Sequence, residues 1–174
     1  MGAPRRRPSR RHQGKAQHAL RNPDPRRSGF SLIVVDASVA IKVALYEPDS
    51  PIAVAALRAQ PWSAPDLILS ECANIIWKRC RMGDITRDQA MQAVTLIETM
   101  NLDVEPGRRL IERAVELAIA LDHPAYDCFY IAHAEQLGAP LLTADKKLIA
   151  KTRASDATNI EIMGLDDYAR KNDL

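Results

Sequence analysis

Four acidic residues stand at points of the sequence where their carboxylates could act together on a ligand. Asp36 and Asp145 each follow a short apolar run, and Glu71 and Asp127 lie in segments with helical periodicity. Carboxylate oxygens suit a hard cation such as Mg²⁺, which keeps several waters and needs only one or two direct carboxylates. Without a cation, such a cluster would repel itself and raise the pKa of some members. The four acids therefore favour a cation site, provided that the fold brings them together.

Each acid also has an ordinary structural explanation, and none is decisive alone. Asp36 and Asp145 could each cap the helix that follows, although Ser38 is available as the N-cap after Asp36. Asp127 would complement a helix dipole. Glu71 could be a solvated residue on the surface of its helix.

The apolar runs before Asp36 and Asp145 have the composition of central parallel strands. Residues 32–35 (LIVV) are aliphatic without polar alternation, and residues 140–143 (PLLT) form a second buried run. In open parallel sheets, ligands bind outside the carboxyl ends of the strands. If the two strands are neighbours, Asp36 and Asp145 share one edge of the sheet.

The rest of the chain alternates between helical periodicity and short extended pieces. Helices are predicted at 38–45, 52–59, 67–82, 86–100, 110–121, 126–137, around 147–151 and at 165–171, and further strands at 62–64, 102–104 and 160–162. Thr86 and Gln89 have the spacing of a capping box, and Gly83 and Gly138 end helices. This alternation predicts parallel βαβ units and an α/β sandwich.

The predicted helix at 67–82 is amphipathic. At about 100° per residue, Glu71, Asn74, Lys78 and Arg81 form one polar stripe, and the apolar residues lie on the other side. This polar stripe either faces a ligand or is an ordinary solvent-exposed face of the helix.

Charge divides the chain into two unlike parts. Residues 1–29 hold nine of the 24 Lys and Arg and one of the 22 acids, so residues 30–174 carry 15 basic and 21 acidic residues. The first part has almost no large apolar side chains and is predicted to be a disordered basic tail. It is either a basic arm that attracts polyanions or an extension from a start codon placed too early, which we favour because the first strand begins near Leu32. Residues 30–174 are predicted to form one domain.

Cysteine usage and hydropathy bear on location. Three cysteines without a Cys-x-x-Cys pair favour reduced thiols and a cytoplasmic protein over a metal-thiolate site. No stretch approaches the roughly 18 apolar residues of a membrane helix, so no membrane partner is expected.

Four short motifs, taken in order, resemble the PIN-domain ribonucleases and, within them, the VapC-type toxins of toxin–antitoxin pairs. They are VVDASV at 34–39, SECAN at 70–74, YDCFYIA at 126–132 and LTADKKL at 142–148. The likeness runs from about Leu32 to the C-terminus and leaves only the tail outside. It implies a PIN-like three-layer α/β sandwich, with a central, mostly parallel sheet of four to five short strands flanked by helices.

The resemblance also implies a site and its partners. Asp36, Glu71, Asp127 and Asp145 would be the catalytic acids, and the three aspartates would hold Mg²⁺ or Mn²⁺. Three polar residues would support them: Ser38, Asn74 and Thr143. Of these, Asn74 would orient the glutamate or the substrate, or else be a surface amide. The family further implies a homodimer that cuts RNA and is inhibited by a cognate antitoxin protein.

The expected reaction is hydrolysis of an RNA phosphodiester by a metal-activated water, without a covalent enzyme intermediate. His123 is assigned to a loop and His133 to packing, and neither is expected to act as the general base. Because the domain is acidic, RNA binding would draw on cations near the motifs, and those predicted for it, unless they are ordinary solvated charges, are Lys42, Lys78, Arg81 and Lys146.

Two other functions are weighed. A haloacid-dehalogenase-like phosphatase needs a second Asp two residues after the first, and position 38 is Ser, which nearly excludes it. A PIN-like module that binds RNA or protein without cutting remains an alternative, and a cleavage assay separates it from a nuclease.

Overall fold

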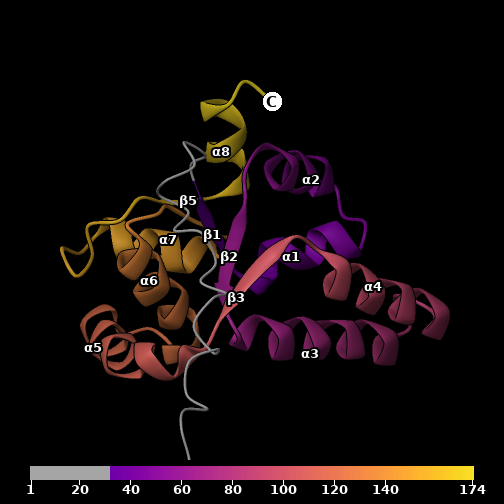
Figure 1. The fold of residues 1–174 in the computed structure, drawn as a ribbon, viewed down its shortest axis with the longest axis horizontal. Coiled ribbons are helices and arrows are strands. Elements are labelled where there is room, and N and C mark those ends of the chain that lie inside the picture. The colour runs from indigo at the N-terminus through magenta and orange to yellow at the C-terminus, as the bar shows by residue number, and fades with distance from the viewer. Residues whose placement is uncertain (1–31) are drawn as a thin grey trace, which may run out of the picture.

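A parallel sheet of five short strands forms the middle layer of the fold (Figure 1). The computed structural model describes residues 32–174, so the tail predicted for residues 1–29 lies outside the described residues. The strands are β1 Ile33–Val35, β2 Trp62–Pro65, β3 Leu102–Glu105, β4 Leu141–Leu142 and β5 Ile162–Met163. Their order is β3-β2-β1-β4-β5, and every neighbouring pair is parallel. This confirms the predicted parallel α/β sheet.

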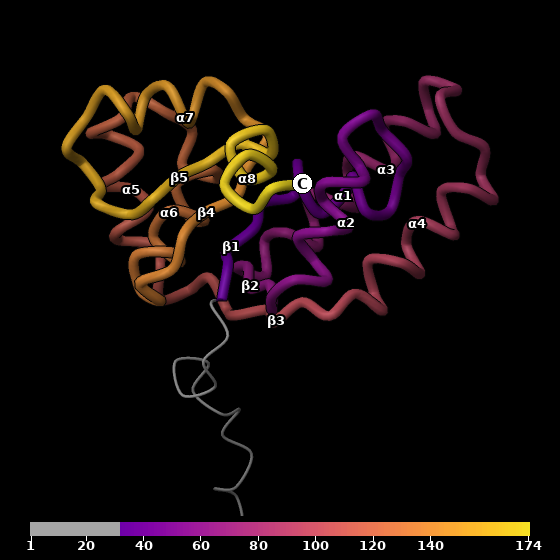
Figure 2. The backbone as a smooth tube through the Cα atoms, turned by 90° about the horizontal axis from the view of Figure 1, so that it is seen from above, coloured from indigo at the N-terminus to yellow at the C-terminus, as the bar shows by residue number. Residues whose placement is uncertain are grey.

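Helices cover both faces of this sheet. Figure 2 shows α1–α4 on one side and α5–α7 on the other, which gives the predicted three layers. The helical elements are α1 Ala37–Ala44, α2 Ser50–Ala59, α3 Leu67–Met82, α4 Arg87–Thr99, the 3₁₀ helix η2 Gly107–Leu110, α5 Ile111–Leu121, α6 Ala125–Leu137, α7 Lys146–Arg153 and α8 Leu165–Lys171.

The strands β1 and β4 read as unbroken apolar runs because both of their faces are buried. Val34 and Val35 in β1, and both leucines of β4, are fully buried. β1 lies between β2 and β4, with Val34 beside Ser63 on one side and Leu141 on the other. The chain beyond β1 therefore runs alongside the chain beyond β4, and the carboxyl ends of these two strands form one edge.

One predicted cap is wrong, and the difference matters for the site. The N-cap of α1 is Asp36 and not Ser38, because Asp36 keeps an extended backbone and its side chain accepts a hydrogen bond from the backbone N–H of Val39. Ser38 lies within the first turn and donates to Asp36 instead. Two elements begin two residues away from the predicted position. β5 begins at Ile162 instead of Ile160, and α2 begins at Ser50 instead of Ile52, with Pro51 in its first turn, where proline fits a helix.

Other local predictions hold. α3 ends at Gly83, whose φ of 81° is a left-handed conformation that favours glycine. Thr86 and Gln89 form the capping box of α4. All three cysteines are free thiols. Within residues 32–174, no helix is both long and apolar enough to cross a membrane.

Candidate active site

Asp36 lies at the carboxyl end of β1 and is almost completely buried, at 7% exposure. Two hydroxyls donate to its carboxylate, Ser38 Oγ to Oδ1 and Thr143 Oγ1 to Oδ2, both at 2.5 Å. The backbone N–H of Val39 donates to Oδ1 at 3.1 Å. Burial raises the pKa of Asp36 to about 6, and the three hydrogen bonds only partly oppose this rise. A cation bound next to this carboxylate would favour its charged form and so offset the cost of burying it.

The same two hydroxyls join Asp36 to the chain after β4. Thr143 Oγ1 accepts from the backbone N–H of Asp145 at 2.9 Å, and Ser38 Oγ accepts from the backbone N–H of Ala144 at 2.8 Å. Asp145 is the N-cap of α7, and its Oδ1 accepts from two backbone N–H groups of that helix. These bonds fix segments more than a hundred residues apart in sequence.

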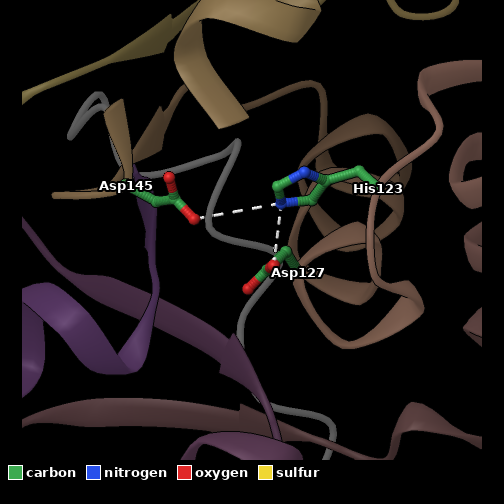
Figure 3. A group of neighbouring side chains, drawn as sticks. All are labelled: His123, Asp127 and Asp145. Carbon is green, nitrogen blue, oxygen red and sulfur yellow. Dashed lines mark ion pairs between the residues drawn. The ribbon is translucent and has the colours of Figure 1, made fainter. Parts of the chain in front are cut away.

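His123 points into the gap between two of the acids (Figure 3). Its Nε2 lies 2.8 Å from Oδ2 of Asp127 and 3.9 Å from Oδ2 of Asp145. The residue lies in the loop before α6, as predicted, and its position beside Asp127 and Asp145 was not predicted. The left-handed backbone of Asp122 at the end of α5, with φ 47°, turns the chain there. The sequence signal that would have identified it is the four-residue step from His123 to Asp127 across Pro124.

Glu71 and Asp127 reach the same place from helices. Glu71 on α3 accepts a hydrogen bond from the hydroxyl of Tyr130 on α6. Burial raises the pKa of Glu71, the Tyr130 hydroxyl lowers it, and the charge of Asp127 raises it. Burial likewise raises the pKa of Asp127, which the neighbouring His123 lowers and the charge of Asp145 raises.

The four predicted acids thus form one electrostatic neighbourhood. Asp36 is affected by the charge of Glu71, Glu71 by that of Asp127, and Asp127 by that of Asp145. Each interaction raises the pKa of the first acid named. The fold therefore brings together the acids that are far apart in the sequence.

The donor atoms of this cluster fit a divalent cation. One side-chain atom each of His123, Asp127 and Asp145 lie within 4.8 Å of one another. The Nε2 atom of His123 is buried, and no properly aligned hydrogen bond satisfies it among residues 32–174. Carboxylate oxygens suit Mg²⁺, and an added imidazole nitrogen is also acceptable to Mn²⁺. Asp36 lies outside this triplet and joins it through the hydrogen bonds of Thr143.

The remaining predicted site residues differ in their surroundings. Asn74 is exposed on α3. Lys42 forms ion pairs with Glu47 and Asp49, at 2.5 and 3.0 Å, and its side chain is only 11% exposed. The Arg81 guanidinium lies 4.9 Å from the ring centre of Trp77.

Two of the predicted RNA-binding lysines have free charges. Lys78 and Lys146 are exposed and have no ion pair in the described part of the chain. Of the four predicted cations, these lysines and Arg81 are therefore better placed than Lys42 to meet an anionic ligand.

Tyr130 was not predicted as part of the site, although it stands in the third motif. His133, on the same helix, points elsewhere, as predicted from its position on α6. It is fully buried and its Nε2 lies 2.8 Å from Ser63 Oγ in β2. Burial lowers its pKa to about 4, so it is a packed, neutral side chain at neutral pH.

Comparison with known proteins gives one family and several solved relatives. The model of the PIN domain matches residues 33–154. A curated relative, "Ribonuclease VapC3" of Pyrobaculum aerophilum, is 34% identical over 122 residues, which make up 68% of this chain and 93% of the relative.

Two solved structures share the fold at lower identity. The crystal structure of PAE2754 from Pyrobaculum aerophilum superposes with a TM-score of 0.61 at 20% identity and covers 83% of this chain and 98% of that one. VapC20 of Mycobacterium tuberculosis, described as a toxin that cleaves the sarcin-ricin loop, gives a TM-score of 0.54 at 18% identity over 68% of this chain and 94% of that one. At these identities the likeness concerns the fold alone.

Proposed function

The chain belongs to the PIN-domain family, and from this premise we propose that it is a metal-dependent endoribonuclease and the toxin of a toxin–antitoxin pair. The observation that carries the proposal is the cluster of four acids at the carboxyl edge of the sheet. Hydrogen bonds of Ser38 and Thr143 join the segment that carries Asp36 to the segment that carries Asp145. The relative named as a ribonuclease supports it, because the match spans nearly the whole of that protein.

In this proposal Asp36, Asp127 and Asp145 hold Mg²⁺ or Mn²⁺. The cation supplies charge neutralisation and polarisation at the scissile phosphate. Asp36 is held in place by two hydroxyls and a backbone N–H. The carboxylate of Asp127 is oriented by His123, which lies against it; partners of this kind fix the geometry of metal ligands.

Glu71 has a different role. Its side chain is half-buried, its pKa is raised, and its carboxylate accepts a hydrogen bond from the Tyr130 hydroxyl. A carboxylate whose pKa is raised is a stronger base and is suited to accept a proton. We assign it the proton of the attacking water, and Asn74, one turn further along α3, is assigned to contact with the substrate.

The partners follow from the family and from the surface. RNA would meet the exposed cations Lys78, Arg81 and Lys146, whereas Lys42 is already paired. A cognate antitoxin and a second copy of the chain are further proposed partners. In support, α5 exposes three apolar side chains in a row at four-residue spacing, Ile111, Val115 and Ile119, and such patches mark association surfaces. Free thiols at all three cysteines accord with a cytoplasmic location.

A cleavage assay on labelled RNA tests the proposal. Cleavage should appear with Mg²⁺ or Mn²⁺, stop with EDTA, and be lost in Asp127→Asn. The matched control is Asp156→Asn, because Asp156 is an exposed aspartate beyond the end of α7 and does not belong to the acidic cluster; this variant should cut normally.

The assay has two contrary outcomes. Cleavage that persists in EDTA, or in Asp127→Asn, would exclude the metal-dependent site. RNA that is bound but never cut would favour the alternative of a non-cleaving PIN-like module.

A further inference from the structure

A cavity of about 330 Å³ lies beside the acidic cluster, between α7 and α8. We name it the α7–α8 cavity. Its walls include Thr143 and Ala144, which follow β4, and Gly164 and Leu165, which follow β5. Thr143 is shared between the two sites, because its hydroxyl donates to Asp36 while the residue also lines the cavity.

The position of the cavity on the sheet is that of a binding site. Its lining follows the carboxyl ends of β4 and β5, and the acidic cluster follows those of β1 and β4. Ligands of open parallel sheets bind along this edge, where the strand order reverses. In the order β3-β2-β1-β4-β5 the reversal lies between β1 and β4. The cavity therefore extends the cluster by one strand along the same edge.

Two arginines of the cavity wall are held in place by one acid. Asp167 on α8 forms ion pairs with Arg153 of α7, at 2.8 Å, and with Arg170 of α8. One carboxylate between two guanidinium groups leaves one positive charge unbalanced. Because both groups are already oriented, less freedom is lost when they bind an anion.

The lining as a whole carries equal numbers of cations and acids: Lys146, Arg153 and Arg170 against Asp49, Asp166 and Asp167. Lys146 has no ion pair within residues 32–174, whereas Asp49 is paired with Lys42 at 3.0 Å. Among the described residues of the lining, Asp166 is the remaining acid without an ion pair. The cavity therefore offers cations next to a cluster that carries only negative groups and one histidine.

We propose that the α7–α8 cavity binds one nucleotide of the RNA strand, adjacent to the phosphodiester that is cut. Arg153, Arg170 and Lys146 hold its phosphate. The inference rests on the proposed function, and it deepens it by giving the substrate a second point of attachment. The volume lies at the small end of the range for ligand pockets, roughly 300–1,000 Å³, which fits a single nucleotide and not a duplex.

The test measures binding of a fluorescein-labelled, single-stranded RNA of mixed sequence to the full chain. Asp36→Asn is present throughout and EDTA is added, so that binding is read without cleavage. One variant removes the cations, Arg153→Gln with Arg170→Gln. A second, Ala150→Phe, fills the cavity from the exposed face of α7 without changing charge. The control, Arg58→Gln with Arg87→Gln, removes two exposed arginines that do not line the cavity.

We expect the cavity variants to bind roughly tenfold more weakly than the control, as for loss of a hydrogen bond to a charged group. The arginine variant should also lower the slope of log affinity against log salt, by about 0.7 for each phosphate of a single strand that is no longer neutralised. Thermal unfolding should show that all variants are folded.

The outcomes separate the two proposals. If both cavity variants match the control in affinity and salt slope, the cavity is not a nucleotide site, although RNA binding and cleavage elsewhere stand. If no variant or parent binds RNA and the unmodified chain does not cut it, the proposed function itself fails, and this inference with it.

Discussion

The two halves of the acidic cluster are held in different ways. The strand half, Asp36 and Asp145, is held by hydroxyls and backbone N–H groups that also join β1 to β4. The helix half, Glu71 and Asp127, relies on one side-chain partner for each acid, Tyr130 and His123.

The difference shows where rigidity and adjustment lie. In the strand half, removing one partner leaves other buried polar groups unsatisfied, so position and stability depend on the same bonds. The acids of the helix half are half-buried, as Asp145 also is, but each has a single side-chain partner, which water can replace when it is lost. The strand half is therefore the fixed reference of the site, and the helix half can adjust to a ligand.

Asp36→Asn should have the largest effect on cleavage. It should lower activity while raising the stability of the fold. Cleavage should fall on the order of a thousandfold, as when one group that stabilises a transition state is removed. Without cation, the folded chain should become more stable by about 1–2 kcal/mol at pH 8. The reason is that a carboxyl whose pKa is raised to about 6 destabilises the fold above that pH. Asparagine is also a good N-cap, and the neighbouring hydroxyls can rotate to accept from its amide.

The measurement is chemical unfolding in EDTA at pH 8 and below pH 3.8, beside a cleavage assay. The gain should vanish at the lower pH, where the wild-type carboxyl is protonated in both states. A variant that is less stable than wild type at pH 8 would show that the strand half is not strained by buried charge.

Thr143→Val should lower both stability and cleavage activity, because in the strand half the two depend on the same hydrogen bonds. It removes the donor to Asp36 and the acceptor for the N–H of Asp145 in a fully buried position. We expect a loss of about 1–3 kcal/mol in unfolding free energy and of roughly 10–100-fold in cleavage rate. Thr143→Ser keeps the hydroxyl and should restore most of both; if valine and serine behave alike, the hydroxyl is not what joins the two strands.

Tyr130→Phe should have a smaller effect, and on activity alone. Glu71 loses its one side-chain partner but can turn to water, so the unfolding free energy should change by less than about 1 kcal/mol while cleavage falls roughly tenfold. Equilibrium unfolding and initial rates test both parts. A loss of stability as large as that of Thr143→Val would remove the distinction between the two halves.

The sequence predicted the strand half better than the helix half. Asp36 and Asp145 follow apolar runs typical of central parallel strands, so local pattern predicted a shared edge on the condition that the two strands are neighbours. It did not predict their hydrogen bonds, because Ser38 was assigned the cap that Asp36 occupies. His123 was missed because it lies in the loop before α6, where periodicity gives no direction to a side chain. Tyr130 was missed because helical periodicity fixes which face a residue lies on and not which distant side chain it meets. Tyr130 contacts an acid 59 positions away, and this pairing depends on how α3 and α6 pack.

His133 tests how firmly the helix half is supported at a point away from the acids. Replacing it should change the stability of the fold and not the cleavage activity. It lies on α6, the helix that also carries Asp127 and Tyr130, but it faces β2, where its Nε2 lies against Ser63. Burial is the main cause that lowers its pKa from 6.5 to about 4, and the charge of Asp103 raises it slightly. Above pH 6.5 the residue is neutral in both states. Between 6.5 and about 4 the unfolded chain takes up its proton first, so stability falls as the pH falls.

The contribution of His133 to that loss should be about 3 kcal/mol over the window. Because carboxyl groups titrate there too, the readout is the difference between wild type and His133→Gln, whose unfolding free energy should depend less steeply on pH. Ser63→Ala is the matched control and should keep the wild-type slope, since burial and not the hydroxyl is the main cause of the shift. If the unfolding free energy depended equally steeply on pH in wild type and in His133→Gln, water would reach His133 at this end of α6. In that case α6 would not be firmly packed against β2, and the helix half of the site would lack a fixed support.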